Sequence, residues 1–190
     1  MRRILILPTL ALASVLTMAA TYSLPEALPW NVDASHTEVN FTVKHFFTPV
    51  TGTFSSYDID LVFDPEAPEN SSVSVVIDVE SVDTRNERRD NHLRSGDFFN
   101  AETYPQITFQ STSVQQVGPD QLLARGNLTI KETTREIELP ITVLGLQELP
   151  PEMSEMMGGI TRVAGFQAET TIDRREFEVG VANWAQTVIV

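Results

Sequence analysis

From His36 onward, the chain alternates apolar and polar residues with a period of two. Val39, Phe41 and Val43 fall on one side of an extended chain and polar residues on the other, which is typical of a strand with one face in water. Turn-forming residues separate the alternating stretches, at 64–70, 118–120 and 150–159. We therefore predict about eight antiparallel strands. The further alternating positions are Ile59, Leu61 and Phe63; Val73, Val75, Ile77 and Val79; Ile107 and Phe109; Ile137, Leu139, Ile141 and Val143; and Phe166, Ala168, Thr170 and Ile172.

The sequence predicts one short helix, over Glu87–Arg94, between Thr84 and Gly96. Long alternating strands with a single short helix favour a closed barrel over a sandwich. An eight-stranded barrel is either filled by its own side chains or just wide enough to hold one ligand, and the pattern leaves both alternatives open. Because the inward positions are Val, Ile, Leu and Phe, a ligand held there would be apolar.

Residues 146–160 contain two prolines, three methionines and two glycines. This composition predicts a mobile loop with adaptable apolar side chains. Such a loop is either a lid over an opening or an ordinary hairpin connection.

The first 22 residues have the order of a secretory signal peptide. A basic start, Met1-Arg2-Arg3, precedes an apolar run over residues 4–20 that ends in small residues. We expect residues 1–22 to be removed and residues 23–190 to form one exported, periplasmic domain without stable membrane insertion. The alternative is an uncleaved anchor, because the run approaches the roughly 20 residues that span a bilayer.

Charge and composition exclude several classes of protein. The net charge of −13 disfavours nucleic-acid binding, which depends on clustered basic residues. Removing residues 1–22 takes away two arginines and no acid, so the charge becomes −15. Because the chain contains no cysteine, disulfides and thiolate metal sites are impossible. The three histidines lack metal-pair spacing, and neither a nucleophile elbow nor a phosphate-binding loop occurs, so we expect no metal, no cofactor and no catalysis.

Four arginines, Arg85, Arg88, Arg89 and Arg94, lie within ten positions of an otherwise acidic chain. Their guanidinium groups could clamp a phosphate or carboxylate at the mouth of a cavity. The alternative is an ion-pair network that holds the loop, because Asp83, Glu87, Asp90 and Asp97 are interleaved with the arginines.

Several ordered blocks of the chain resemble the YceI-like family of lipocalin-like proteins. They are residues 30–36, Val39–His45, 52–54 and the long block 81–109, followed by residues 126–130 with Thr134 and Arg135, and by 165–166 with 172–174. The chain departs from the family pattern at Glu132 and Glu178, where the family usually has glycine. Since glycine adopts positive φ at no steric cost, we expect these two turns to differ in geometry.

The resemblance implies an all-β, eight-stranded antiparallel barrel, exported to the periplasm, with an apolar tunnel that holds a polyisoprenoid chain. It implies non-catalytic binding, storage or transport of a polyprenyl phosphate or an isoprenoid quinone. The alternatives are a stress-protective or structural barrel without a lipid, and an accessory enzyme of isoprenoid quinone metabolism. Whether two chains pair as a homodimer is left open.

Two groups of residues are the predicted site. Arg85, Arg88, Arg89 and His92 are the candidates for binding the ligand's head group. The candidates for lining the tunnel are Val39, Phe41, Val43, Phe54, Ile77, Val79, Phe109, Leu139, Ile141, Phe166, Ala168 and Ile172.

Overall fold

The computed structural model describes residues 28–181, 184 and 188–189. The predicted signal peptide, residues 1–22, and the first residues of the expected domain lie outside this part of the chain. Within it, the structure contains no helix with the length and apolar character needed to cross a bilayer.

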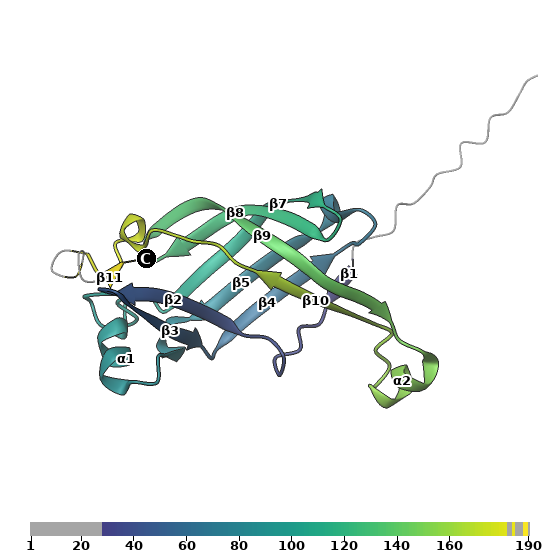
Figure 1. Cartoon of the computed structure of the whole chain (residues 1–190), viewed down its shortest axis with the longest axis horizontal. Coiled ribbons are helices and arrows are strands. Elements are labelled where there is room, and N and C mark those ends of the chain that lie inside the picture. Colours follow the sequence, from purple (N-terminus) through teal and green to yellow (C-terminus); the bar gives the residue numbers. More distant parts are fainter. Residues whose placement is uncertain (1–27, 182–183, 185–187, 190) are drawn as a thin grey trace, which may run out of the picture.

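The described residues form two antiparallel sheets, drawn in Figure 1. The larger sheet has the order β1 (Leu28–Trp30), β4 (Tyr57–Phe63), β5 (Ser72–Asp78), β7 (Gln106–Gly118), β8 (Gln121–Ile130), β9 (Thr133–Glu148) and β10 (Arg162–Ala168). The smaller sheet has the order β11 (Val188–Ile189), β2 (Val39–His45), β3 (Thr48–Phe54) and β6 (Val82–Asp83). The all-β antiparallel class is confirmed. Eight strands have seven residues or more, and β1, β6 and β11 are short strands that the alternation did not predict.

The larger sheet curls into a half-barrel, and the smaller sheet covers part of its open side (Figure 1). The two sheets meet at the corner between β3 and β4, where the Ser55 amide donates to the Ser81 carbonyl at 3.3 Å. On the other side, no ladder joins β10 to β2 among the described residues. The expected closed barrel is therefore open along one seam, because no strand pairing links β10, at the edge of the larger sheet, to β2 of the smaller sheet among the described residues.

Helix α1 (Glu87–Arg94) has the predicted boundaries. Its N-cap is Asn86, whose side-chain oxygen accepts the Arg89 amide at 3.1 Å. The prediction of a single helix is wrong, because α2 (Pro151–Met156) lies within the expected mobile loop. Pro151 occupies the first turn, where its missing N–H costs nothing, but α2 has only six residues, which is too short for an apolar period to distinguish a helix from a loop.

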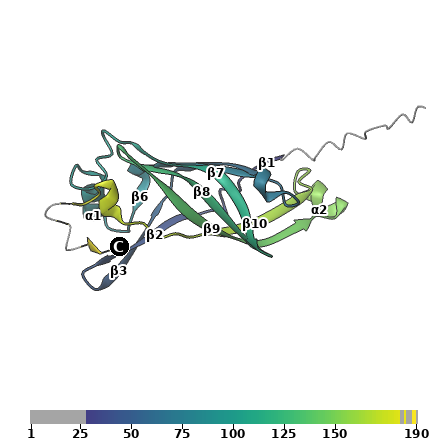
Figure 2. The ribbon, with the colours of Figure 1, turned by 90° about the horizontal axis from the view of Figure 1, so that it is seen from above.

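The fold also contains the 3₁₀ turns η1 (Pro68–Asn70), η2 (Val79–Ser81) and η3 (Arg174–Phe177). Helices α1 and α2 lie at opposite ends of the half-barrel, as both views show (Figures 1 and 2). The two ends can therefore be described separately as the α1 end and the α2 end.

The packed core is concentrated at the α1 end. There Phe54, Val79, Val82, Phe98 and Phe177 are buried in one cluster with residues of β7 and β8. A smaller cluster of Phe63, Val114, Leu122 and Ala124 lies towards the α2 end, and Leu139 packs against both clusters. The interior between the clusters is not filled by a continuous core.

Glu178 adopts the left-handed conformation, with φ 56° and ψ 30°. A glycine would enter this region at no steric cost, whereas a residue with a Cβ enters it at about 1 to 2 kcal/mol. The turn at Glu178 therefore keeps a conformation that suits glycine. In the turn that contains Glu132, the residue with positive φ is the preceding Lys131, at 56°.

Candidate functional site: a cavity inside the half-barrel

A cavity of about 2440 Å³ occupies the interior between the two sheets. Pockets for drug-sized molecules measure roughly 300 to 1,000 Å³, so this cavity has room for a much larger guest. Residues from β1 to β5 and from β7 to β10 line it. Of the two alternatives that the sequence left open, the structure has the hollow interior.

Cross-strand neighbours build the apolar wall of this cavity. Val75 on β5 stands opposite Phe109 on β7, and Phe109 stands opposite Leu128 on β8. Side chains at paired positions point to the same face of a sheet, so each pair extends one apolar surface. The wall follows directly from the period-two alternation along these strands.

Gly126 leaves room for the ring of Phe109, which lies close to its backbone. A Cβ on Gly126 would stand 2.6 Å from the Phe109 Cζ and 2.5 Å from the Gln110 carbonyl oxygen, closer than atoms pack. Any larger residue at position 126 would therefore displace Phe109 or separate β7 from β8.

Aromatic pairs line the cavity towards both ends. At the α2 end, the rings of Phe63 and Phe166 meet edge to face with centroids 5.1 Å apart. Nearer the α1 end, Phe41 and Phe54 lie 5.4 Å apart. Such pairs add about 0.5 to 1.5 kcal/mol beyond the burial of their area, so they hold the walls in defined positions.

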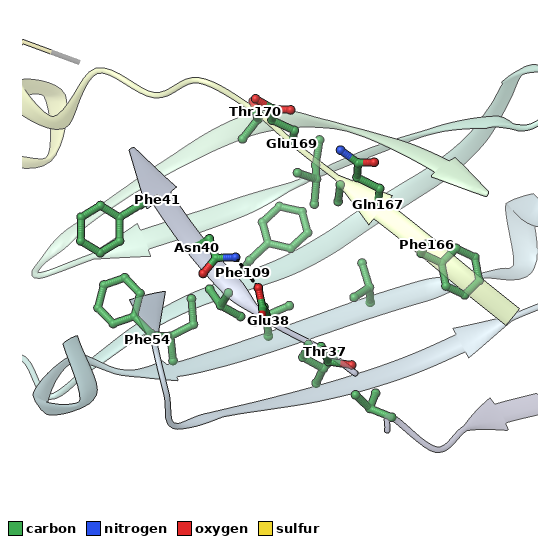
Figure 3. A pocket seen from close by; sticks show the side chains of 18 of the residues that line it. Thr37, Glu38, Asn40, Phe41, Phe54, Phe109, Phe166, Gln167, Glu169 and Thr170 are labelled. Atoms are coloured by element: carbon green, nitrogen blue, oxygen red, sulfur yellow. Dashed lines mark hydrogen bonds between the residues drawn. The ribbon is translucent and has the colours of Figure 1, made fainter. Parts of the chain in front are cut away.

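The seam between β2 and β10 is polar. Glu38, just before β2, and Asn40, within it, line the cavity, and Asn40 donates to the Glu38 carboxylate at 2.9 Å. Gln167 on β10, and Glu169 and Thr170 just after it, line the cavity from the other strand (Figure 3). Water reaches these groups because Glu38, Asn40, Gln167, Glu169 and Thr170 are all exposed. The apolar interior therefore has a polar opening along its side.

Of the twelve predicted tunnel residues, all but Val79 line the cavity. Val79 is 1% exposed and packs in the core at the α1 end. The alternation assigned it to the same strand face as Ile77, but β5 ends at Asp78 and Val79 begins η2. The expected strand through Thr170 and Ile172 likewise ends early, because β10 stops at Ala168.

Three of the four predicted head-group residues, Arg88, Arg89 and His92, line the cavity at the α1 end. The Arg89 guanidinium donates to the Thr84 hydroxyl at 2.7 Å and to the Thr84 carbonyl at 2.8 Å. Arg85 does not line the cavity. It lies by a separate shallow pocket on the outer side of β2 and β3, where it donates to Thr51 at 3.3 Å.

His92 is held by its neighbours. Its Nε2 lies 2.9 Å from an Asp97 carboxylate oxygen, and its ring meets those of Phe98 and Trp184 edge to face. The hydrogen bond from His92 is the largest influence that lowers the pKa of Asp97 below its ordinary value. His92 is therefore a positioned group whose ring faces the cavity.

Arg88 differs from the other arginines of this segment. It is exposed, lines the cavity and makes no hydrogen bond or ion pair with the described residues. Arg94, by contrast, donates to the carbonyls of Glu80 and Val82, both at 2.8 Å. Arg88 is thus the guanidinium of this segment that is free to meet an anionic group.

The alternative of a one-for-one ion-pair network in this segment is wrong. Asp90 is buried and accepts the Thr84 amide at 2.9 Å and the Thr84 hydroxyl, rather than pairing with an arginine. Arg94 contacts Glu80 at 3.4 Å, an acid outside the predicted set. Backbone carbonyls and Thr84 hold the loop, which is why charge spacing did not reveal its structure.

Sequence reasoning missed the polar seam and Trp30, which also lines the cavity. Glu38 falls on the polar side of the first alternating stretch, and no local signal marks two strands that fail to pair. Trp30 stood in a resembling block but had no alternating neighbours, although its ring lies 6.0 Å from Phe63 and its indole N–H donates to the Phe63 carbonyl at 3.0 Å.

Known proteins are similar to this chain in both sequence and fold. The model of the YceI-like domain matches residues 30–190. Protein YceI of Salmonella arizonae is 37% identical over 148 residues, which cover 77% of this chain and 73% of that protein.

Solved structures of other proteins are also similar to the chain in fold. The crystal structure of BcnA from Burkholderia cenocepacia has a TM-score of 0.72 at 26% identity and covers 83% of this chain and 92% of its own. A YceI protein from Campylobacter jejuni has a TM-score of 0.66 at 29% identity, covering 84% and 91%. With its hollow half-barrel and a family match that spans nearly all described residues, the chain belongs to the YceI-like domain family.

Proposed function

We propose that this protein binds and carries a long isoprenoid lipid, either a polyprenyl phosphate or an isoprenoid quinone, in the periplasm and without catalysis. The observation that carries the proposal is the apolar cavity of about 2440 Å³ inside the half-barrel. The order of residues 1–22, typical of a signal peptide, supports the periplasmic location.

The energy of burial favours a long apolar tail. Each CH₂ group removed from water contributes about 0.8 kcal/mol, so about twenty buried carbon groups, or four isoprene units, contribute roughly 16 kcal/mol. Association and ordering of the tail cost on the order of 4 to 15 kcal/mol. A tail of several isoprene units therefore binds with a net gain, whereas a short apolar molecule does not.

The polar groups around the cavity fit a lipid with a head group. Arg88 at the α1 end offers a free guanidinium, which suits a phosphate. The exposed polar residues of the seam would let a head group or water reach the side of the tail. The carrier needs no reacting groups, and away from the polar seam the cavity wall between the two ends consists mainly of aliphatic and aromatic side chains.

The direct test is native purification, organic extraction and mass spectrometry, followed by titration of the emptied protein with a fluorescent polyprenyl phosphate. We expect about one isoprenoid per chain and saturable uptake. Leu139→Trp narrows the cavity where the two clusters meet and should weaken uptake at least about tenfold, because part of the tail loses its place.

The matched control is Thr142→Trp, which adds the same bulk to an exposed position of the same strand. It should leave uptake unchanged. Protein that is repeatedly recovered empty, and that does not take up added polyprenyl lipid, would refute the carrier and favour the barrel without a lipid.

A further inference from the structure

The hairpin that joins β9 to β10 extends beyond the rest of the sheet. The pairing of β9 with β8 ends at Thr142, opposite Gln121. Beyond it, Gly145 to Glu148 pair with Arg162 to Gly165 of β10 and with no other described strand. Residues 144–163, here called the arm, form a two-stranded ribbon with α2 at its tip, at the end opposite α1 (Figures 1 and 2).

The arm carries an apolar surface that faces water. Of the twelve large hydrophobic residues that are exposed among the described ones, seven lie in the arm. Four of them, Met153, Met156, Met157 and Ile160, surround the tip, and Met156 is 87% exposed. An isolated two-stranded ribbon is marginally stable in water, and clustered apolar exposure marks an interaction surface.

This apolar surface runs into the cavity. Leu144, Met157, Ile160 and Val163 are exposed and also line the cavity. Trp30 lines the cavity at the root of the arm, where the guanidinium carbon of Arg162 lies 5.5 Å from its ring centroid. Tryptophan is a side chain that concentrates at membrane interfaces, and methionine adapts to irregular apolar surroundings.

Charge limits what can cover the arm. It carries three carboxylates, Glu148, Glu152 and Glu155, against one guanidinium, Arg162. An anionic surface would repel it. A second copy docked about a two-fold axis would bring two acidic arms together, which is unfavourable as well. A net-neutral phospholipid surface neither repels the carboxylates of the arm nor brings a second acidic arm close to them.

We propose that the arm docks this protein on a bilayer of net-neutral phospholipids, with the methionines of the tip in the interface. Docking would let a lipid tail pass between the bilayer and the cavity without crossing water. Only this role of docking rests on the proposed function. Docking itself requires nothing in the cavity.

The test uses the absence of cysteine from the chain. A single cysteine introduced by Met156→Cys carries a polarity-sensitive fluorophore, and vesicles of phosphatidylcholine and phosphatidylethanolamine without any isoprenoid are added. We expect a blue-shifted, brighter emission, little affected by salt and weaker when phosphatidylglycerol replaces part of the lipid. The matched control is Phe47→Cys, a 94% exposed position in the β2–β3 turn at the other end, whose label should not respond.

Unlabelled variants measure the contribution of the tip by co-sedimentation with the same vesicles. Replacing Met153→Ser and Met156→Ser together should lower the partition coefficient about tenfold or more. Phe46→Ser with Phe47→Ser should change it less than about twofold. Because neither measurement needs a ligand in the cavity, loss of lipid uptake and loss of docking are separate results.

Three results would overturn the proposal. The first is no binding to vesicles by the unaltered protein, and the second is equal binding by the Met153/Met156 variant. The third is a response of the Met156→Cys label that depends on protein concentration and needs no vesicles, which would assign the arm to a second copy of the chain.

Discussion

Substituting two valines, one in the packed core and one in the cavity wall, tests whether the interior is hollow. Val82 is 0% exposed in the core at the α1 end, whereas Val75 is half-buried and lines the cavity. Shortening each valine to alanine removes the same two carbon atoms. A difference between the two variants therefore reports on the surroundings of the side chain and not on its chemistry.

The expected magnitudes follow from burial. Val82→Ala loses about 1.6 kcal/mol of transfer free energy and leaves a void that close packing cannot fill, so we expect about 2 to 3 kcal/mol of destabilisation. Val75→Ala merges its space with a cavity that already exists, and a half-buried side chain loses about half of the transfer term. We expect about 0.5 to 1 kcal/mol for Val75→Ala.

Urea unfolding of the ligand-free protein, followed by circular dichroism, measures both variants. With a denaturant slope of about 2 kcal/mol per molar, the unfolding midpoint should fall by about 1 to 1.5 M for Val82→Ala and by less than about 0.5 M for Val75→Ala. Equal shifts would refute the reasoning, because they would mean that Val75 is packed as tightly as the core.

The same pair reports on the bound lipid. A ligand at 100 times its Kd raises stability by about 2.7 kcal/mol. Val75→Ala should reduce this gain because the tail loses contacts with the wall, and Val82→Ala should retain it in full. A reduced gain in Val82→Ala alone would place the ligand outside the cavity.

Three further predictions concern individual side chains. Arg88→Gln should weaken binding of a polyprenyl phosphate about tenfold and that of a quinone little, whereas Arg85→Gln should affect neither, in a fluorescence titration; equal effects of both variants would exclude Arg88 as the phosphate ligand. Glu178→Gly should raise stability by about 0.5 to 1 kcal/mol in thermal unfolding, because glycine adopts the left-handed conformation without strain, and a loss of stability would contradict this. The hydrogen bond from Arg175 lowers the pKa of Asp173 from 3.8 to about 2 in the folded protein, so its stabilising effect is present above about pH 4 and is lost as the pH falls towards 2. Asp173→Asn should therefore flatten the dependence of the unfolding free energy on pH between about 4 and 2. An unchanged dependence would show that water screens the pair.

Local periodicity was sufficient for the strands and for most of the cavity wall. Successive side chains of a strand point to opposite faces, so Phe41, Phe109 and Leu139 had to face one side wherever their strands paired. Helix α1 was equally predictable, because its boundary signals lie within the segment itself, between Thr84 and Gly96. The resemblance to the YceI-like family then implied that these strands assemble into one antiparallel barrel.

Other features required knowledge of what packs against what. The position of Val79 depended on where β5 stops, and the freedom of Arg88 depended on Thr84 and the backbone carbonyls engaging its neighbours. Helix α2 has only six residues and buries none of them, so its sequence is too short to distinguish it from a loop. In each case, the deciding contact joins residues that a local pattern does not relate.

The sequence by itself determined the class of the fold, the direction of the alternating side chains and the apolar character of the interior, because these properties depend on near neighbours in the chain. Only the tertiary structure decided that β2 and β10 stay apart, that the interior remains hollow and that the arm projects from one end. Hydrogen bonds between strands far apart in sequence depend on the geometry of the whole sheet. The opening to the cavity and the surface beside it follow from that geometry.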